Sequence, residues 1–390
     1  MKATALLLLA GNLAHGFSGM RDLKARAASL ESRGTNEMIG DLVNLPDNRL
    51  TKTGADIKAL LTGGQNPEEL TDRYDKVPDK DSPKCKADTC CIWKHIADDM
   101  RSKMVGSARR CNDLARGCIR LGFHDAATWS KNTGPGGGSD GSIVLARECY
   151  DREINKGLEP TCDQMTAWHN QYKKYNVGMA DLIQFAANVA TVACPLGPRV
   201  RTFVGRKDDS KPAPDGLMPL PSDSADKLIS MFGSKTIAPD ELVALVGAHT
   251  TAQQRFVDPS RAGDPLDSTP GVWDVRFYGQ VTSSSTPRRV FKFQSDINLS
   301  QDPRTNGPWK AFSGPTGQRP WNGAYSRAYI RLSLLGVNNI NDLKECSKAL
   351  PSALDFFQSP DQSQLDAFAN GKFNDAKGQL MQGDNITAPP

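Results

Sequence analysis

The stretch RLGFHDAATWS, residues 120–130, contains one of only five histidines in the chain, four residues after an arginine. Leu114, Cys118, Leu121 and His124 recur at intervals of three and four, which predicts one face of an α-helix. A glycine-rich segment follows within a dozen residues. The pattern therefore predicts a helix that carries a histidine from an apolar face towards an irregular loop.

Arg120 and His124 are one helical turn apart, so their side chains project from the same face. A guanidinium next to an imidazole lowers the imidazole pKa by like-charge repulsion. A neutral imidazole can take up a proton and return it to another atom, while the arginine stabilises nearby negative charge. The pair suits heterolysis of a peroxide O–O bond. The alternative is a hydrogen-bonded histidine in the core.

The loop GGGSDGS, residues 136–142, is rich in oxygen donors. Carboxylates, hydroxyls and backbone carbonyls are the ligands that calcium prefers. An ordinary polar loop is the alternative interpretation. The candidate calcium ligands are Asp125, the carbonyl of Gly138, Asp140 and Ser142.

The second half of the chain repeats this arrangement. His249 follows the apolar run 242–246, and the segment PLDSTPGVWD, residues 265–274, lies downstream. An imidazole in apolar surroundings suits an iron ligand. A second set of candidate calcium ligands comprises Thr250, Asp267, Thr269, the carbonyl of Val272 and Asp274.

The composition excludes several classes of protein. The chain has 390 residues and a formal net charge of +4, and its lysines and arginines are scattered. Without a block of like charge, nucleic acid is a poor candidate partner. No stretch reaches the roughly 20 apolar residues that a membrane span requires. The length allows one large domain or two ordinary ones.

The N-terminus and the cysteines indicate an oxidising compartment. Residues 1–16 have a lysine, a short apolar run and small residues, as in a secretory signal peptide. Nine cysteines and two glycosylation sequons, at Asn298 and Asn385, agree with secretion to the extracellular space. There is no CxxC or CxxCH motif, which argues against structural zinc and covalent haem.

The remaining chain reads as mainly α-helical with long loops. We expect helices within residues 179–194, 239–250 and 325–335, and a short strand at residues 288–293. Residues 17–84 are polar and predict an extension or propeptide. Residues 85–355 form the predicted compact domain, and residues 356–390 a loose polar tail.

Five motifs, in this order, resemble the secreted fungal class II haem peroxidases, the family of lignin, manganese, versatile and generic peroxidases. The resemblance covers residues 85–350. It implies an all-α fold in which a distal and a proximal half enclose one non-covalent haem b, with two calcium ions. The motifs are RLGFHDA, GGGSDGS, LVGAHTTA, LDSTPGVWD and FQSDINLSQDPRT.

The resemblance also implies roles for individual residues. His249 matches the proximal iron ligand and Asp296 its carboxylate partner. His124 matches the distal acid–base residue, Arg120 its charge-stabilising partner and Phe123 the distal aromatic position. Asn155 resembles the asparagine that orients the distal histidine, and Glu148 a glutamate associated with it. The two oxygen-rich sets match the family's distal and proximal calcium ligands.

The cysteines resemble the family's in part. The resemblance implies disulfides between Cys111 and Cys194, Cys90 and Cys346, and Cys85 and Cys91. Cys149 and Cys162 could form a pair peculiar to this chain, which would leave Cys118 free.

Departures from the family narrow the subtype. Ala244 stands where lignin and versatile peroxidases carry an exposed tryptophan, and Asp113, Gly117 and Arg255 stand at the three manganese-binding positions. Leu266 occurs in generic peroxidases. We therefore expect a monomeric, low-specificity peroxidase that uses hydrogen peroxide to oxidise phenolic or aromatic donors at the haem edge. The alternatives are a lignin-degrading enzyme with another surface tryptophan or tyrosine, and a non-catalytic, calcium-stabilised binding protein.

Overall fold

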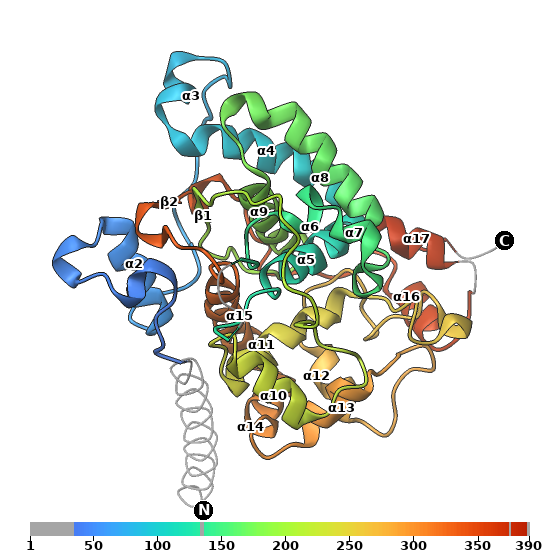
Figure 1. Ribbon diagram of the computed structural model, residues 1–390. Helices are drawn as coiled ribbons and strands as arrows, with labels where there is room; N and C mark the ends of the chain where they lie inside the picture. The colour runs from blue at the N-terminus through green and yellow to red at the C-terminus, as the bar shows by residue number, and fades with distance from the viewer. Residues whose placement is uncertain (1–34, 133–135, 374–375, 388–390) are drawn as a thin grey trace, which may run out of the picture.

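The computed structural model describes residues 35–132, 136–373 and 376–387, and this part of the chain is mostly helical (Figure 1). The predicted signal peptide, residues 1–16, lies outside the described residues. Strands β1 (Phe203–Val204) and β2 (Lys344–Glu345) form one short antiparallel pair. The all-α fold class is confirmed. The α-helices are α2 Lys52–Leu61, α3 Pro83–Ala87, α4 Thr89–Met104, α5 Asp113–Ala126, α6 Ser142–Leu145, α7 Glu148–Asp151, α8 Glu159–Tyr172, α9 Met179–Ala193, α10 Ala225–Gly233, α11 Pro239–Val246, α12 Arg276–Thr282, α13 Gln294–Gln301, α14 Asn306–Ser313, α15 Gln318–Leu332, α16 Gln362–Ala369 and α17 Lys377–Gln382.

Helices α5 and α9 form the centre of the fold. Every residue of α9 is buried, so this helix passes through the core, and α5 packs along it. Asn112 caps α5 by accepting a hydrogen bond from the Ala115 amide, which satisfies a free donor at the helix start. The Gln184 side chain donates to the Gly122 carbonyl at 3.0 Å and ties the two helices together. This packing fixes the face of α5 that carries Arg120 and His124.

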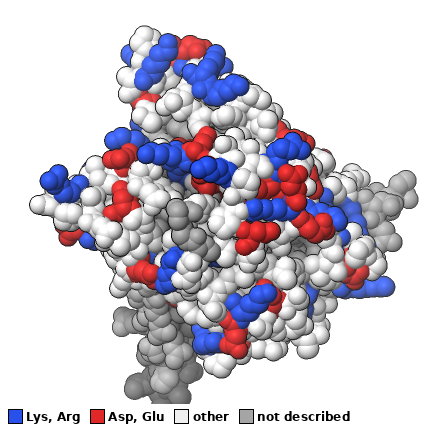
Figure 2. Space-filling model, in the orientation of Figure 1, with Lys and Arg blue, Asp and Glu red and all other residues white. Residues whose placement is uncertain are grey.

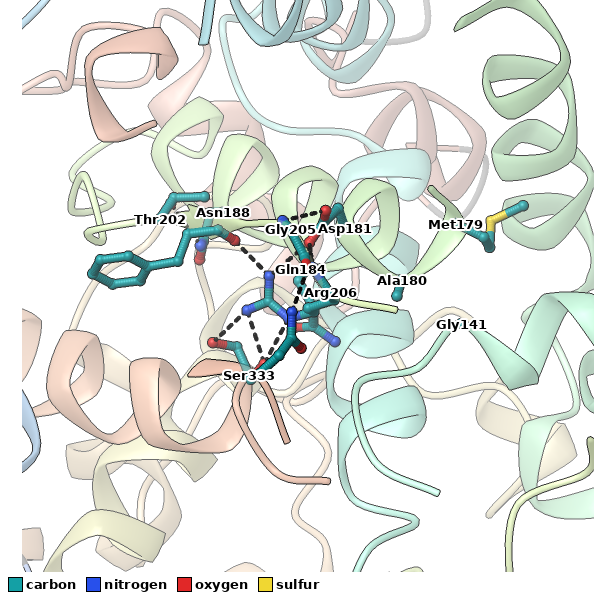
Figure 3. Close-up of polar contacts among 12 residues, drawn as sticks. Gly141, Met179, Ala180, Asp181, Gln184, Asn188, Thr202, Gly205, Arg206 and Ser333 are labelled. Atoms are coloured by element: carbon teal, nitrogen blue, oxygen red, sulfur yellow. Dashed lines mark hydrogen bonds and ion pairs between the residues drawn. The ribbon is translucent and has the colours of Figure 1, made fainter. Parts of the chain in front are cut away.

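A buried ion pair fastens the start of α9 to the end of α15 (Figure 3). Asp181 lies 3.0 Å from the Arg206 guanidinium and also accepts from the Gly205 amide at 2.6 Å. Arg206 in turn donates to the Ser333 carbonyl. Because removal of one member leaves a buried charge unpaired, disruption of such a pair costs about 3–5 kcal/mol.

Residues 35–84 lie against the main body, although their polar composition predicts a separate extension. Ile57 and Leu60 of α2 are fully buried and join the central core. Arg331 of α15 donates to the Thr35 carbonyl at 2.6 Å and the Glu37 carbonyl at 2.7 Å. The buried apolar residues of this segment come from α2 and from Ile39 and Leu42 before it, and together they dock the segment onto the larger domain.

The C-terminal segment differs in the same way from the loose tail that its composition predicts. Leu365, Phe368 and Leu380 of α16 and α17 are buried in a small core of their own. Arg110, which is fully buried, pairs with Asp361 at 2.8 Å and connects this core to the main body. The apolar side chains of α16 and α17 form the core and the ion pair attaches it to the main body, which average composition does not predict.

Four disulfides connect eight of the nine cysteines, all of which lie in the described part of the chain. The four pairings expected from the sequence are confirmed, including the pair Cys149–Cys162. Cys118 is free and buried within α5. The predicted strand at residues 288–293 is wrong, because this segment forms turn and irregular structure. Its Phe291 amide bonds to the Pro265 carbonyl, but no ladder forms.

Charges are mixed over the face shown in Figure 2, where lysine and arginine side chains alternate with aspartate and glutamate. This face presents no extended field of one sign, unlike a surface that binds the phosphate backbone of nucleic acid. Within the described residues, no helix is both long enough and apolar enough to span a bilayer.

Candidate active site

A cavity of about 560 Å³ lies between the two halves of the fold. Arg120, Phe123 and His124 of α5 line one side, and His249 and Leu266 line the other. Most other lining residues are apolar. The structure thus brings the two histidines singled out in the sequence to one largely apolar cavity that opens to the surface.

Arg120 and His124 are in direct contact, as their spacing predicts. The Arg120 Nε donates to His124 Nε2 at 3.2 Å. His124 Nδ1 lies 2.8 Å from Asn155 Oδ1, and the Asn155 amide donates to the Glu148 carbonyl at 3.0 Å. Since Asn155 Oδ1 is an acceptor, the proton of the neutral imidazole is on Nδ1. Nε2, which accepts the Arg120 hydrogen bond, is then the basic nitrogen of the ring, at the cavity wall.

Burial, together with the Arg120 charge, lowers the pKa of His124 to about 3, against which the Asn155 hydrogen bond acts weakly. The sequence predicts only the repulsion by Arg120, and the structure shows that burial is the larger cause. Burial likewise lowers the pKa of Arg120 to about 10, so its guanidinium stays charged at neutral pH. The site therefore combines a neutral base with a fixed positive charge.

His249 lies in the 3-10 segment Gly247–Thr251 that directly follows α11, at the opposite wall of the cavity. Its Nδ1 is 3.2 Å from Oδ2 of Asp296, which is fully buried on α13. Phe277 and Phe293 approach the imidazole edge-on, with centroids 5.7 and 5.6 Å away. These neighbours fix the ring and leave Nε2 as the nitrogen with no hydrogen-bond partner among the described residues.

The residues around the cavity fit a haem group. An open imidazole nitrogen, oriented by a buried carboxylate, is the donor that haem iron takes. The apolar lining suits the flat face of a macrocycle, and the opposite wall presents a base and a cation. The Asp296 Oδ1 atom is buried without a hydrogen-bond partner in the described structure. The imidazole of His249 is therefore the hydrogen-bond partner of this carboxylate.

Comparison with known proteins agrees with this geometry. A protein-family model described as Peroxidase matches residues 99–314. The chain is 31% identical over 289 residues to a peroxidase of Arthromyces ramosus, covering 68% of this chain and 77% of the relative. A versatile peroxidase of Pleurotus eryngii is 31% identical over 287 residues, covering 68% and 75%. The chain belongs to the peroxidase family.

Other relatives include a manganese peroxidase of Phlebia radiata and a ligninase of Phanerodontia chrysosporium, 31% and 32% identical, covering 67% of this chain and 72% and 75% of the relatives. The resemblance to fungal class II peroxidases is thus confirmed, and the chain is an oxidoreductase of that family. This membership argues against the non-catalytic binding protein.

A cluster of carboxylate, hydroxyl and carbonyl oxygens lies beside His124. Asp125, which is fully buried, accepts from the Gly141 amide at 3.2 Å. Burial and the nearby Asp140 raise the pKa of Asp125 well above its ordinary value. Ser142 is buried next to Asp140, and its amide donates to that carboxylate at 2.9 Å. Gly138 directs its carbonyl into the same turn, where it accepts from the Asp140 amide.

A second cluster lies beside the proximal histidine. The Thr250 hydroxyl donates to Asp267 at 2.5 Å, and the Thr269 hydroxyl donates to Asp274 at 2.8 Å. Burial and mutual repulsion raise the pKa of Asp267, and burial raises that of Asp274. The Val272 carbonyl lies 3.5 Å from the Thr250 oxygen. Each cluster thus combines one fully buried and one partly buried carboxylate, which suits a divalent cation with calcium's coordination preferences.

An ion-pair network occupies the positions that correspond to a manganese site. Asp113 pairs with Arg255 and, at 2.9 Å, with Arg116. Burial raises the pKa of Asp113, but the two guanidiniums outweigh it and hold this pKa below its ordinary value. A Cβ at Gly117 would meet the Thr161 hydroxyl at 2.2 Å, so a glutamate there is also blocked. The sequence predicts the loss of ligands but not this neutralisation by Arg116.

The sequence did not lead us to predict two features of the cavity, a pair of backbone contacts and an exposed apolar rim. The Ile154 and Lys156 carbonyls accept hydrogen bonds from Arg120 at 3.2 and 2.9 Å, and a backbone acceptor leaves no trace in residue type. At the cavity mouth, Phe256 and Val257 are each half exposed. Two large apolar residues next to Arg255 were a visible signal for this exposed rim.

Proposed function

We propose that this peroxidase is a secreted enzyme of the generic type, which uses hydrogen peroxide to oxidise small phenolic and aromatic donors in one-electron steps. The observation that carries the proposal is the single apolar cavity with the contacting pair Arg120 and His124 on one wall and the carboxylate-bound His249 on the other. No other part of the described structure combines a neutral base, a cation and an open imidazole nitrogen.

The proximal residues would hold the cofactor. Bound haem b supplies the redox chemistry of iron at this site. His249 would hold the haem iron through Nε2, because Nδ1 is occupied by Asp296. The buried carboxylate makes the imidazole a stronger donor, which favours the oxidised states of a metal. Phe293 and Leu266 would provide apolar contact around the ligand and exclude water from it.

The distal residues would handle the proton and charge of hydrogen peroxide. His124 is neutral across the physiological range because its pKa is held near 3, so Nε2 accepts a proton from one peroxide oxygen. The same nitrogen then returns the proton to the other oxygen, which leaves as water. Arg120 stabilises the negative charge that develops on the departing oxygen. Asn155 keeps Nδ1 protonated and the ring in orientation throughout.

The rim of the cavity supports the proposal that the enzyme has low specificity for its electron donor. Phe256 offers an exposed apolar ring, with the Lys156 ammonium 5.6 Å from its centroid. The arginines around Asp113 disfavour a divalent cation there. Ala244 is fully buried and its carbonyl accepts from Trp321, so no side chain at this position reaches the surface.

Further parts of the proposal concern the environment of the enzyme. The distal and proximal oxygen clusters would each bind one calcium ion, because Asp125 and Asp267 are fully buried with no cationic side-chain partner among the described residues and so require a counter-charge. Four disulfides and the leader-like residues 1–16 support secretion. We expect a monomer.

Side-by-side kinetics would test this function. The haem-loaded protein should show a Soret band and should oxidise a simple phenol with hydrogen peroxide. Under identical conditions, we expect little turnover of manganese(II) or veratryl alcohol. Efficient veratryl alcohol oxidation would instead favour a relay through another surface residue, such as the 40% exposed Tyr150. Absence of haem binding would contradict the proposal altogether.

A further inference from the structure

The disulfide Cys149–Cys162 joins α7 to the first turn of α8, across a sequence separation of 13 residues. Both sulfur-bearing side chains are buried, at 1% and 0% exposure. Helix α8 packs against both α5 and α7, and Figure 1 shows the three helices side by side. The disulfide therefore closes a loop that lies directly over the distal wall of the cavity.

Three consecutive residues in this loop hold both distal side chains. The Ile154 carbonyl and the Lys156 carbonyl each accept a hydrogen bond from the Arg120 guanidinium, at 3.2 and 2.9 Å. Asn155, between them, binds His124 Nδ1 at 2.8 Å. Displacement of this one segment would thus release the base and the cation together.

The segment has little structure of its own to resist displacement. Glu153–Asn155 is a single 3-10 turn, and such short turns are not stable alone. The flanking side chains of Glu153 and Lys156 are 84% and 51% exposed. Gly157, with φ of +84°, has a left-handed backbone conformation that ends the turn before α8 begins. The turn is anchored through its two ends.

The disulfide provides a covalent anchor at both ends. On the α7 side, Glu148 accepts from the Ala213 amide at 2.8 Å and pairs with Arg152 at 2.5 Å. Cys149 follows Glu148 directly, and Cys162 lies one helical turn after Leu158, whose amide bonds to the Asn155 carbonyl. Loss of the cross-link would let α7 and the start of α8 separate, and residues 154–156 would follow.

We propose that the Cys149–Cys162 disulfide is a positioning element for the peroxide step, which acts through residues 154–156 to hold Arg120 and His124 in register. This inference rests on the proposed function of the cavity. It differs from a purely stabilising role, in which the folded protein without the cross-link would react with peroxide at the normal rate.

The test is the double variant Cys149→Ala/Cys162→Ala, loaded with haem and compared with Cys85→Ala/Cys91→Ala. The control removes another short disulfide, at α3 and α4, that does not line the cavity. We expect the second-order rate constant for hydrogen peroxide to fall about 10- to 100-fold in the first variant, since small misplacements of reacting groups cost this much. The rate constant with which phenol reduces the enzyme after the peroxide step should stay close to that of wild type.

A second measurement does not depend on turnover. Hydrogen cyanide must give up a proton when it binds ferric iron as cyanide, so its association rate reports on a distal base. This rate should fall in parallel with the peroxide rate in the Cys149→Ala/Cys162→Ala variant and remain unchanged in the control.

The outcomes separate this inference from the proposed function. If the wild-type protein shows neither a Soret band nor peroxidase activity, the proposed function itself is wrong. A folded, haem-loaded variant with wild-type peroxide and cyanide rates would overturn the inference alone. If the alanine pair does not fold, Cys149→Val/Cys162→Ala retains more apolar volume for the same assays. Failure of that variant to fold as well would assign the disulfide a stabilising role only and overturn the proposal.

Discussion

His124 and His249 face the same cavity, but neighbours of different chemistry hold them. The distal imidazole lies between a guanidinium and an amide, and both of its side-chain partners are tied to one disulfide-closed loop. The proximal imidazole has one carboxylate and two aromatic edges. Under the proposed function, the residue that would move protons is kept neutral, whereas the residue that would bind the metal has a buried carboxylate as its partner.

The largest expected effect comes from removal of the distal base. His124→Leu should lower the rate constant for the peroxide reaction by about 10³-fold or more, in the upper range for a general acid–base residue. Stopped-flow mixing of the ferric enzyme with hydrogen peroxide measures this rate. His169→Leu, on α8 and away from the cavity, is the matched control. A near-normal rate in His124→Leu would place the proton transfer elsewhere.

The proximal half should respond differently. Asp296→Asn removes the negative partner of His249 and should weaken haem retention or activity by about 10- to 100-fold, as expected when the partner of a metal ligand is lost. The rate of haem transfer to an excess of an apo-globin measures retention. Asp226→Asn, at an exposed ion pair on α10, serves as control. If haem loss is unchanged and only the peroxide rate falls, Asp296 does not act on haem retention, and the proposed separate roles of the two halves are wrong.

Calcium removal should affect both halves through different residues. Chelation should lower the melting temperature by several degrees, because an ion at 100 times its Kd stabilises a protein by about 3 kcal/mol. Asp140→Asn should then reduce mainly the peroxide rate, and Asp274→Asn mainly haem retention, since Asp125 follows His124 and Thr250 follows His249. If both variants lose peroxide rate and haem retention equally, the two sites do not act on separate halves. If magnesium fully restores the melting temperature after chelation, calcium is not the specific ion.

The smallest effect concerns pH. The folded-state pKa of His124, about 3, is below its ordinary value of 6.5, so His124 stays neutral until strongly acidic pH. The peroxide rate should therefore be nearly constant from pH 7 to about pH 4 and be halved near pH 3. The same depression means that His124 reduces stability progressively as the pH falls from about 6.5 to 3, because the unfolded state then binds the additional proton. A rate that halves near pH 6 would show an exposed imidazole.

Much of the site was predictable, and the reasons are local. Arg120 and His124 meet because residues one helical turn apart share a face, and five ordered motifs carry the family resemblance. The contacts that position them were not predictable. Carbonyl groups of Ile154 and Lys156 have no signature in the sequence, because every residue carries one.

The fold shows the same division. Periodicity predicted α5, α9 and α11, whereas composition did not predict how the described parts of residues 17–84 and 356–390 pack. Residues 35–84 and 356–387 are polar on average, but a few buried side chains and the pairs formed by Arg331 and Arg110 bind them to the core. Average polarity does not reveal where an arginine will find buried carbonyls or a carboxylate.

The free cysteine has a consequence for an enzyme that generates radicals. Cys118 lies on α5, two residues before Arg120, and is fully enclosed by the core. Burial raises the pKa of its thiol far above the ordinary value, and the protonated thiol is the unreactive form. The chain thus keeps its one free thiol close to the oxidising centre, yet shielded by packing from the enzyme's own products and from exchange with the four disulfides.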